Sequence, residues 1–257
     1  MPLKFGGHIA IKNFMKWHIG CSGFLYRDWK NIFYPPEIPQ KKWLNYYSDQ
    51  FDTLEINSSF YKFPEEKNLK KFHDQTSDNF KFSLKAPRLI THFKKMKGCE
   101  ALLPDLYGAA IKGLKEKLGP ILFQFPPSFI YSLENLEVII KNLNPDFKNV
   151  VEFRNASWFT NDTENALSGA GIIMSGLSHP VLKHKQMIIK NSSIIYYRFH
   201  GIKKLFYSAY TKETLESFYM EAMQTDADEI FIFFNNTASP AAIKNALFLK
   251  KIVNNSS

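Results

Sequence analysis

The stretch VVEFRN, residues 150–155, carries the pattern that predicts the fold. Its valines and phenylalanine are typical of a buried strand, yet Glu152 and Arg154 lie among them. Side chains alternate along a strand, so Glu152 and Arg154 share one face while Val151 and Phe153 share the other. In a sheet closed into a barrel, the outer face packs against helices and the inner face points into the interior. We therefore expect the two charged side chains to point into a barrel.

Seven further β-rich runs, each followed by a loop and, in most cases, a helical pattern, complete the set. They are WHIGCSG (17–23), FDTLEINSS (51–59), FKFSLKAPR (80–88), PILFQFPPS (120–128), GIIMSG (171–176), IIYYRFHG (194–201) and EIFIFFNN (229–236). Eight strands spaced by roughly 20 to 40 residues leave room for crossover helices and match the count of a (β/α)8 barrel. The predicted fold class is therefore α/β, a (β/α)8 TIM barrel.

Apolar residues recur at helical spacing between these runs. The helical patterns cover residues 38–51, 64–75, 105–119, 133–144, 211–224 and 239–253. The connections before and after the sixth strand carry the weakest patterns.

The chain is predicted to hold a single domain, because it contains no linker, internal repeat or low-complexity tract. We expect the barrel to span residues 17–253. Residues 1–16 are expected to form a loosely ordered N-terminal extension, with Met15 as an alternative start.

Composition narrows the class of partner. The 257 residues include 33 Lys and Arg against 24 Asp and Glu, a formal charge of +9, which favours an anionic partner.

The two cysteines lack the spacing of a disulfide framework or a zinc site. No apolar run is long enough for a signal peptide or a membrane span, so we expect a cytoplasmic protein with no membrane partner. Nothing in the sequence indicates an oligomeric state.

Alternation assigns polar residues to the inner face of the other strands as well. The inward set is Thr53, Glu55, Asn57, Ser83, Lys85, Gln124, Glu152, Arg154, Arg198 and His200. Most of it gathers toward the C-terminal ends of the strands, where TIM barrels build their active sites. Buried charges cost several kcal/mol to desolvate, so these must be paired with one another or meet a ligand. The inward charges are consistent with two interpretations, a structural ion-pair network and a ligand-binding site.

Cationic side chains outnumber carboxylates in this set. Against Glu55 and Glu152 stand Lys85, Arg88, Arg154 and Arg198, with His92 and His200 beside them. Guanidinium groups bind phosphate or carboxylate through two parallel hydrogen bonds. We therefore predict that Arg88, Arg154 and Arg198 bind an anionic ligand, either a phosphorylated small molecule or a nucleic acid.

The candidate catalytic residues are Glu55, Glu152 and His200: the carboxylates as an acid/base pair and the imidazole as a proton shuttle. In the competing interpretation an arginine neutralises each carboxylate, which stays ionised and is a poor acid. The candidate ligand-binding residues are Ser22, Tyr26, Asn57, Tyr61, Lys85, Arg88, His92, Gln124, Arg154, Trp158, Arg198 and Asn235. Among them, the amides of Asn57, Gln124 and Asn235 would orient the ligand. The rings of Tyr26, Tyr61 and Trp158 would stack on a base or sugar.

The strand-end motifs resemble those of the YecE-like family, domain of unknown function number 72. The resemblance is carried by HIGCSGFLYRDWKNIFYP (18–35), LEINSSFYKFP (54–64), FKFSLKAPRLITH (80–92), LGPILFQFPPSF (118–129), VVEFRNASW (150–158), YYRFHG (196–201) and FIFFNN (231–236). It extends from about Trp17 to Val253 and implies a TIM barrel without an established activity. Two departures stand out. Cys21 replaces a common Thr, and MSGLSHP (174–180) lacks the usual Asp, so no strand-six acid is available.

A more distant resemblance is to sugar isomerases and apurinic endonucleases, which hold divalent metals with His, Asp and Glu. The inward set offers Glu55, Glu152 and His200, with His18 near the opposite end, too few ligands for such a site. We predict no metal. The absence of a glycine-rich phosphate loop disfavours a nucleotide, and no cofactor is predicted. Two alternatives to an anion-binding protein stay open: a metal-independent hydrolase, lyase or isomerase acting on a small sugar or carboxylate, and a non-catalytic nucleic-acid-binding module.

Overall fold

The computed structural model describes residues 15–182, 188–189 and 192–256. The first strand begins at Lys16, so the predicted N-terminal extension lies almost entirely outside the described residues. None of the described helices combines the length and apolar composition needed to cross a bilayer.

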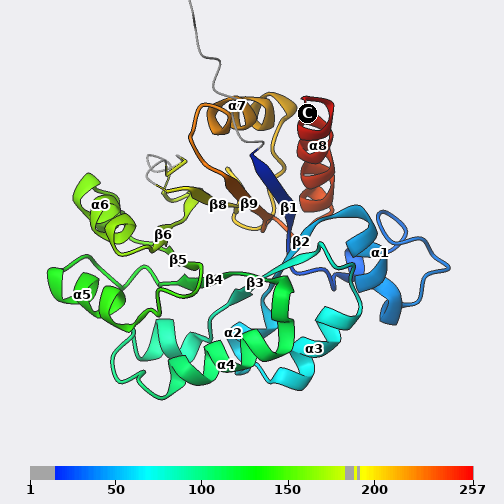
Figure 1. Ribbon diagram of the computed structural model, residues 1–257. Helices are drawn as coiled ribbons and strands as arrows, with labels where there is room; N and C mark the ends of the chain where they lie inside the picture. The colour runs from blue at the N-terminus through cyan, green and yellow to red at the C-terminus, as the bar shows by residue number, and fades with distance from the viewer. Residues whose placement is uncertain (1–14, 183–187, 190–191, 257) are drawn as a thin grey trace, which may run out of the picture.

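Nine parallel strands form one sheet that nearly closes on itself, in the order β6-β5-β4-β3-β2-β1-β9-β8-β7 (Figure 1). The strands are β1 (Lys16–Ser22), β2 (Thr53–Ile56), β3 (Lys81–Lys85), β4 (Leu118–Gln124), β5 (Asn149–Glu152), β6 (Ile173–Met174), β7 (Gly176–Ser178), β8 (Ile194–Phe199) and β9 (Glu229–Phe234). Each runs in the same direction as its neighbours, because crossovers return the chain to the same edge each time. The predicted α/β barrel is confirmed.

The sixth predicted strand is divided into β6 and β7, which raises the count from eight to nine. β6 pairs with β5 and β7 pairs with β8, with Ser175 between them. The backbone N–H of Ser175 still donates to Val151 O at 2.8 Å, on the β5 side. This segment therefore changes partner within a few residues and joins the two ends of the sheet.

Helices surround the strands (Figure 1). They are α1 (Trp43–Gln50), α2 (Ser58–Tyr61), α3 (Glu66–Asp74), α4 (Leu102–Leu114), α5 (Leu133–Asn142), α6 (Asn161–Gly169), α7 (Lys212–Ala222) and α8 (Ala241–Ser256). All six predicted helical patterns are present, and the weak pattern before strand six contains α6. Three helices begin at N-capping residues. The side chains of Ser132, Thr160 and Thr211 accept hydrogen bonds from backbone N–H groups of α5, α6 and α7. The short α2 was not predicted.

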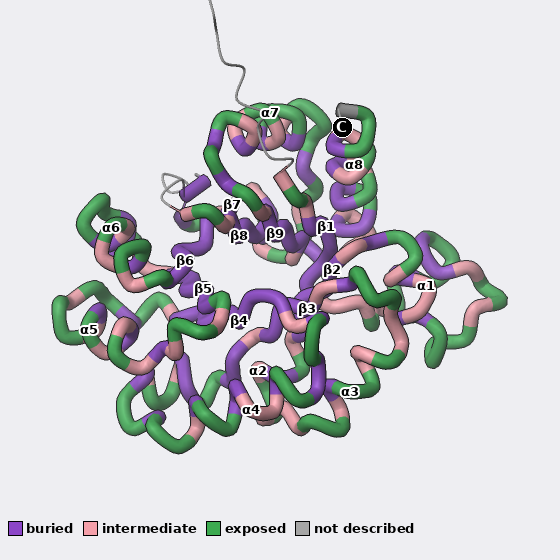
Figure 2. The backbone as a smooth tube through the Cα atoms, viewed as in Figure 1, coloured by how far each residue is buried: buried purple, intermediate pink, exposed green. Residues whose placement is uncertain are grey.

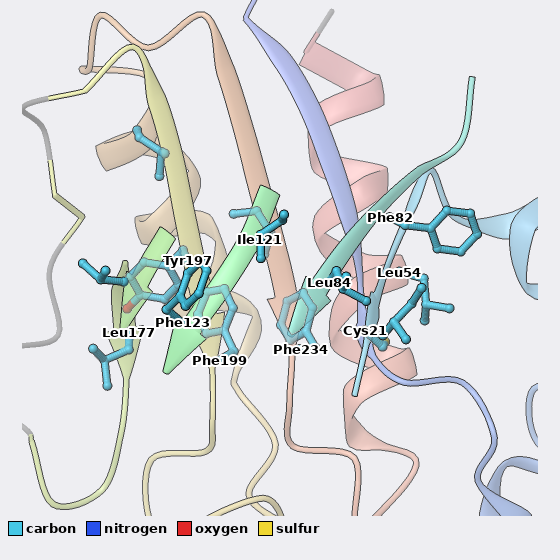
Figure 3. Close-up of a cluster of buried hydrophobic side chains, with 14 of the residues drawn as sticks. Cys21, Leu54, Phe82, Leu84, Ile121, Phe123, Leu177, Tyr197, Phe199 and Phe234 are labelled. Carbon is cyan, nitrogen blue, oxygen red and sulfur yellow. The ribbon is translucent and has the colours of Figure 1, made fainter. Parts of the chain in front are cut away.

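Burial follows the two faces of the strands. The strands carry most of the buried backbone, while the outer sides of the helices are exposed (Figure 2). The outward-facing side chains form the core between sheet and helices, and Figure 3 shows Cys21, Leu54, Phe82, Leu84, Ile121, Phe123, Leu177, Tyr197, Phe199 and Phe234. A separate apolar cluster fills the barrel interior: Leu122, Val150, Ile173, Tyr196, Phe231 and Phe233. The assignment of strand faces from alternation is confirmed.

A small polar cluster lies at the N-terminal end of the barrel. His18 Nε2 lies 2.8 Å from Glu229 Oε1, and Lys148 pairs with the same carboxylate. The His18 ring stacks on Phe231, a member of the interior cluster, at 4.3 Å between ring centroids. His18 is therefore at the opposite end of the barrel from the C-terminal strand ends, as predicted.

Candidate functional site

The polar residues of the inner face meet at the C-terminal end of the barrel, which we call the mouth. Glu55, Lys85, Gln124, Glu152 and Arg198 lie on five different strands, each within its last two residues. Arg154 and His200 follow beyond the ends of β5 and β8 and keep the same inward face. The fold thus brings together side chains that are far apart in sequence.

Arg198 is the centre of a buried ion-pair network. It is 1% exposed, and its Nη2 donates to Glu55 Oε1 at 2.6 Å. Its Nη1 donates to both oxygens of Glu152, at 3.1 and 3.0 Å. Tyr196 Oη donates to the second oxygen of Glu55 at 2.7 Å and lies 2.8 Å from Ser83 Oγ. Because its guanidinium already bridges two carboxylates, Arg198 does not fit the predicted role of a direct anion ligand.

Arg154 lies above this network, closer to solvent. Its Nε donates to Glu152 Oε1 at 2.6 Å, and its side chain is 10% exposed. Its Nη2 lies 3.0 Å from His200 Nε2, which in turn is 3.2 Å from Glu152 Oε2. Asn235 Nδ2 lies 2.8 Å from the other ring nitrogen of His200. The Glu152 carboxylate therefore contacts two guanidinium groups, those of Arg154 and Arg198, and the His200 imidazole.

The charges of this cluster fix its protonation states. Burial alone would raise the pKa of the Glu152 carboxyl, but Arg154, Arg198 and His200 together hold that pKa well below its ordinary value. Burial and the adjacent Arg154 hold the pKa of His200 well below its usual range, against the opposing pull of Glu152. At neutral pH Glu152 is therefore ionised and His200 is uncharged. This supports the interpretation in which Glu152 is a paired carboxylate and a poor acid.

Lys85 occupies the opposite side of the mouth. Its Nζ donates to Gln124 Oε1 at 2.9 Å and lies 4.2 Å from the centroid of the Phe60 ring. His92 packs edge-on against the same ring, with 5.0 Å between centroids. Burial, followed by the charge of Lys85, lowers the pKa of His92 to about 4. At neutral pH this side of the mouth is therefore uncharged at His92 and only partly protonated at Lys85, because burial lowers the pKa of Lys85 to about 7.

Polar atoms of β1 and of the residue after β2 complete the inner wall. Tyr26 Oη donates to Ser22 O at 2.6 Å, and its pKa is raised by burial and also responds to Glu55 and Arg198. Ser22 Oγ and Asn57 Oδ1 are buried and have no hydrogen-bond partner within the described residues. A cavity of about 280 Å³ is lined by Tyr26 and Asn57 together with the apolar Leu54, Ile56 and Phe72, so it extends beside the outward face of β2. Of these groups, Tyr26 and Asn57 line the cavity, whereas Ser22 is fully buried.

The rim of the mouth carries exposed aromatic and basic side chains. Tyr61 and Phe93 are 71% and 69% exposed, and the Arg88 guanidinium lies 5.8 and 5.5 Å from their ring centroids. Arg88 immediately precedes a single π-helical turn, Leu89–Phe93, closed by the backbone N–H of Lys94 donating to Leu89 O at 2.9 Å. Turns of this kind often occur at functional sites. This π-helical turn was not predicted from the sequence.

Trp158 requires a correction, because it does not face the mouth. Its side chain is buried, its ring stacks on Phe153 at 4.0 Å between centroids, and its Nε1 donates to Phe129 O at 2.7 Å. Phe153 belongs to the outward face of strand five, so Trp158 packs in the core between sheet and helices. The order of residues along the chain could not reveal on which side of the sheet this turn folds.

One mouth residue, His179, was not predicted from the sequence. The His179 ring, directly after β7, lies 5.8 Å from the His200 ring, and burial followed by Arg154 lowers its pKa to about 4. Phe206, with φ 63°, donates its backbone N–H to His200 O at 2.7 Å. His179 directly follows Ser178 at the end of a strand, and this position alone could have identified it as a candidate mouth residue. The sequence already suggests Phe206 as an aromatic residue near the mouth, and the loop after β8 brings its backbone to His200.

Within the described parts of the chain, no group of three or more His, Cys, Asp or Glu side chains is arranged to hold a metal ion.

Comparison with known proteins identifies relatives along most of the chain. The UPF0759 protein YunF of Bacillus subtilis is 26% identical over 89% of this chain and 91% of its own. The UPF0759 protein YecE of Escherichia coli K12 is 24% identical over 57% of each chain. The crystal structure of a DUF72 family protein from Thermotoga maritima superposes with a TM-score of 0.84 at 26% identity, covering 93% of this chain and 99% of that one. An Enterococcus faecalis structure of the same family gives 0.78 at 18% identity, over 93% and 95%.

The family model described as "Protein of unknown function DUF72" matches residues 18–257, from β1 to the end of the chain. With the barrel and the relatives above, this match establishes that the chain belongs to the DUF72 family.

Proposed function

We propose that the protein binds an anionic, phosphorylated small molecule at the mouth of its barrel. The observation that carries the proposal is the order of charges from the interior outward. Glu55 and Glu152 are deepest, with side chains 0% exposed, whereas Arg154 is 10% exposed and Arg88 is exposed. A solute that enters the mouth therefore meets cations before carboxylates.

Each group has a distinct part in this proposal. Arg88 and Arg154 would contact the anion, and the Lys85 amine would donate a further hydrogen bond to it. Arg198 would act indirectly, because its bonds to both carboxylates hold Glu152, and through it Arg154, in place. Asn57 and Asn235 would orient the ligand through their amide groups. His200 is buried and a weak base, because burial and Arg154 hold its pKa well below the usual range, so it would act as a hydrogen-bonding group.

A thermal-shift panel of inorganic phosphate, sugar phosphates and small carboxylates tests the proposal. A ligand at 100 times its dissociation constant adds about 2.7 kcal/mol to the free energy of unfolding. For a domain of this size, that raises the melting temperature by roughly 5 to 10 °C. Arg88→Gln and Arg154→Gln should weaken the response at a fixed ligand concentration. Lys112→Gln, on the exposed side of α4, is the matched control and should leave it unchanged.

Two outcomes would contradict the proposal. One is a panel in which no anion raises the melting temperature. The other is a response that Arg88→Gln, Arg154→Gln and Lys112→Gln reduce equally, because the effect would then arise from overall charge.

A second candidate function, single-stranded nucleic-acid binding, is favoured by the rim. Arg88 lies between two exposed aromatic rings, and Lys204 Nζ lies 4.4 Å from the centroid of the exposed Tyr207 ring. Aromatic faces stack on bases, and adjacent cations follow the phosphodiester backbone. Oligonucleotide affinity should then fall steeply between 50 and 200 mM salt. Absence of binding at the lower salt concentration would rule this candidate out.

A further inference from the structure

Lys85 differs from Arg154 and Arg198 in the groups that contact the end of its side chain. Arg198 bonds to Glu55 and Glu152, and Arg154 bonds to Glu152. The Lys85 amine has instead the neutral oxygen of Gln124 and the face of Phe60, and within the described residues no carboxylate forms an ion pair with it. Lys85 is therefore an amine that the fold encloses without an ion-pair partner among the described residues.

A structural role explains a buried lysine elsewhere in the chain. Lys117 is 2% exposed, and its Nζ donates to the carbonyls of His73 and Thr76 at 2.7 and 2.8 Å. It thereby caps the C-terminal end of α3. Lys85 instead donates to the side-chain amide oxygen of Gln124, and the residue is half-buried at the mouth. Among the described residues, Gln124 therefore holds the Lys85 amine in position, and backbone carbonyls do not occupy its hydrogen bonds as they do those of Lys117.

The backbone of Lys85 is fixed from below. Ser59 Oγ donates to Lys85 O at 2.6 Å, so the first turn of α2 ties the end of β3 to the adjacent strand. Gln124, at the end of β4, holds the amine from the other side, and its own Nε2 donates to Phe125 O at 3.0 Å. The amine therefore sits at a defined position on rigid elements, as a reacting group requires.

The surrounding charges favour the neutral amine. Burial, joined by the charges of Arg198 and Arg154, lowers the pKa of Lys85 to about 7 against the opposing pull of Glu55 and Glu152. His92, the remaining titratable group on this side, is neutral above about pH 4. A large fraction of Lys85 is therefore uncharged at neutral pH, whereas an ordinary lysine, with pKa about 10.4, is almost fully protonated.

We infer that Lys85 is a nucleophilic amine that forms an imine with an aldehyde or ketone bound at the mouth. The choice of an anionic carbonyl compound as substrate class rests on the proposed function. In the step, the nitrogen lone pair attacks the carbonyl carbon and the carbonyl π electrons move to oxygen, which takes a proton from solvent. Loss of water from this carbinolamine, with uptake of one proton overall, leaves a protonated imine on Lys85.

Reductive trapping tests the inference on the intact protein. Wild type is incubated at pH 7 with cyanoborohydride and either glyoxylate, an anionic aldehyde, or acetaldehyde, a neutral one. Hydride addition converts the imine into a stable secondary amine that peptide mass spectrometry locates. We expect Lys85 to be labelled more than about tenfold faster than the exposed Lys94, because more of its amine is uncharged. Lys117, held by two carbonyls, is the buried control and should stay unlabelled.

Three outcomes separate this inference from the proposed function. Labelling of Lys85 no faster than that of Lys94 by either probe overturns the inference, whatever the anion panel shows. Fast labelling by both probes, with no preference for glyoxylate and no effect of Arg88→Gln, supports the nucleophile and contradicts the anion site. Fast labelling with a preference for glyoxylate that Arg88→Gln reduces supports both. Lys85→Arg, which keeps the charge, should abolish the adduct at this position.

Discussion

Replacing Arg198 by methionine would test whether the buried network at the mouth stabilises the barrel. Methionine retains much of the length of the arginine stem but cannot donate to the two carboxylates. Glu152 would keep its bonds to Arg154, at 2.6 Å, and to His200, at 3.2 Å. Glu55 would lose the 2.6 Å bond from Arg198 and, among the described residues, keep the bond from Tyr196 alone. The uncompensated charge therefore falls mainly on Glu55.

Leaving one buried ion without its partner costs about 3 to 5 kcal/mol, and the expected loss in the free energy of unfolding is of that size. Adding Glu55→Gln to Arg198→Met removes the uncompensated charge and should recover about 1 to 3 kcal/mol relative to the sum of the single variants. Urea unfolding, followed by circular dichroism and tryptophan fluorescence, measures both quantities. Arg27→Met, at an exposed position after β1, is the control and should change stability by less than about 0.5 kcal/mol.

Two results would refute this reasoning. A loss below about 1 kcal/mol in Arg198→Met would mean that the carboxylates are solvated or protonated once the arginine is gone. Strict additivity of Arg198→Met and Glu55→Gln would mean that the two side chains do not interact energetically.

Three further predictions concern other parts of the barrel. Folded Lys85 loses its proton near pH 7 and unfolded lysine near 10.4, so wild-type stability should rise with pH between these values. Lys85→Met should lack this rise and be more stable than wild type at pH 6 by several kcal/mol in urea titrations; parallel pH profiles would contradict the assignment. Trp158→Ala should lose about 3 to 5 kcal/mol of stability but keep any anion-dependent thermal shift, and selective loss of that shift would place the ring at the ligand after all. Burial raises the pKa of Glu229, but His18 and Lys148 outweigh this effect and lower the pKa to about 2. The ion pairs of Glu229 therefore stabilise the folded protein above about pH 4.3, and this stabilisation is lost as pH falls toward 2. Glu229→Gln should therefore cost about 2 kcal/mol at pH 7 and nothing near pH 2, and a pH-independent loss would count against the ion pair.

Sequence alone determined the architecture of this protein and the inner face of its strands. The alternation in VVEFRN is sufficient to place Glu152 inside and Val151 outside, because strand geometry has a period of two wherever the strand lies. The same rule placed Glu55, Lys85 and Arg198 inside, and parallel strands then put their C-terminal ends at one edge. Local periodicity likewise located the helices, since it reflects which side of each segment is buried.

Tertiary structure alone decided how these groups are paired. Arg198 appears in the sequence as a cation equivalent to Arg154, but the register of the closed barrel places it between two carboxylates and leaves Arg154 nearer to solvent. The division of the sixth strand, the turn that buries Trp158 and the loop that returns Phe206 to His200 also depend on contacts between distant segments. Pairing depends on distances of a few ångströms in three dimensions, and a one-dimensional pattern determines the direction of a side chain but not its neighbours.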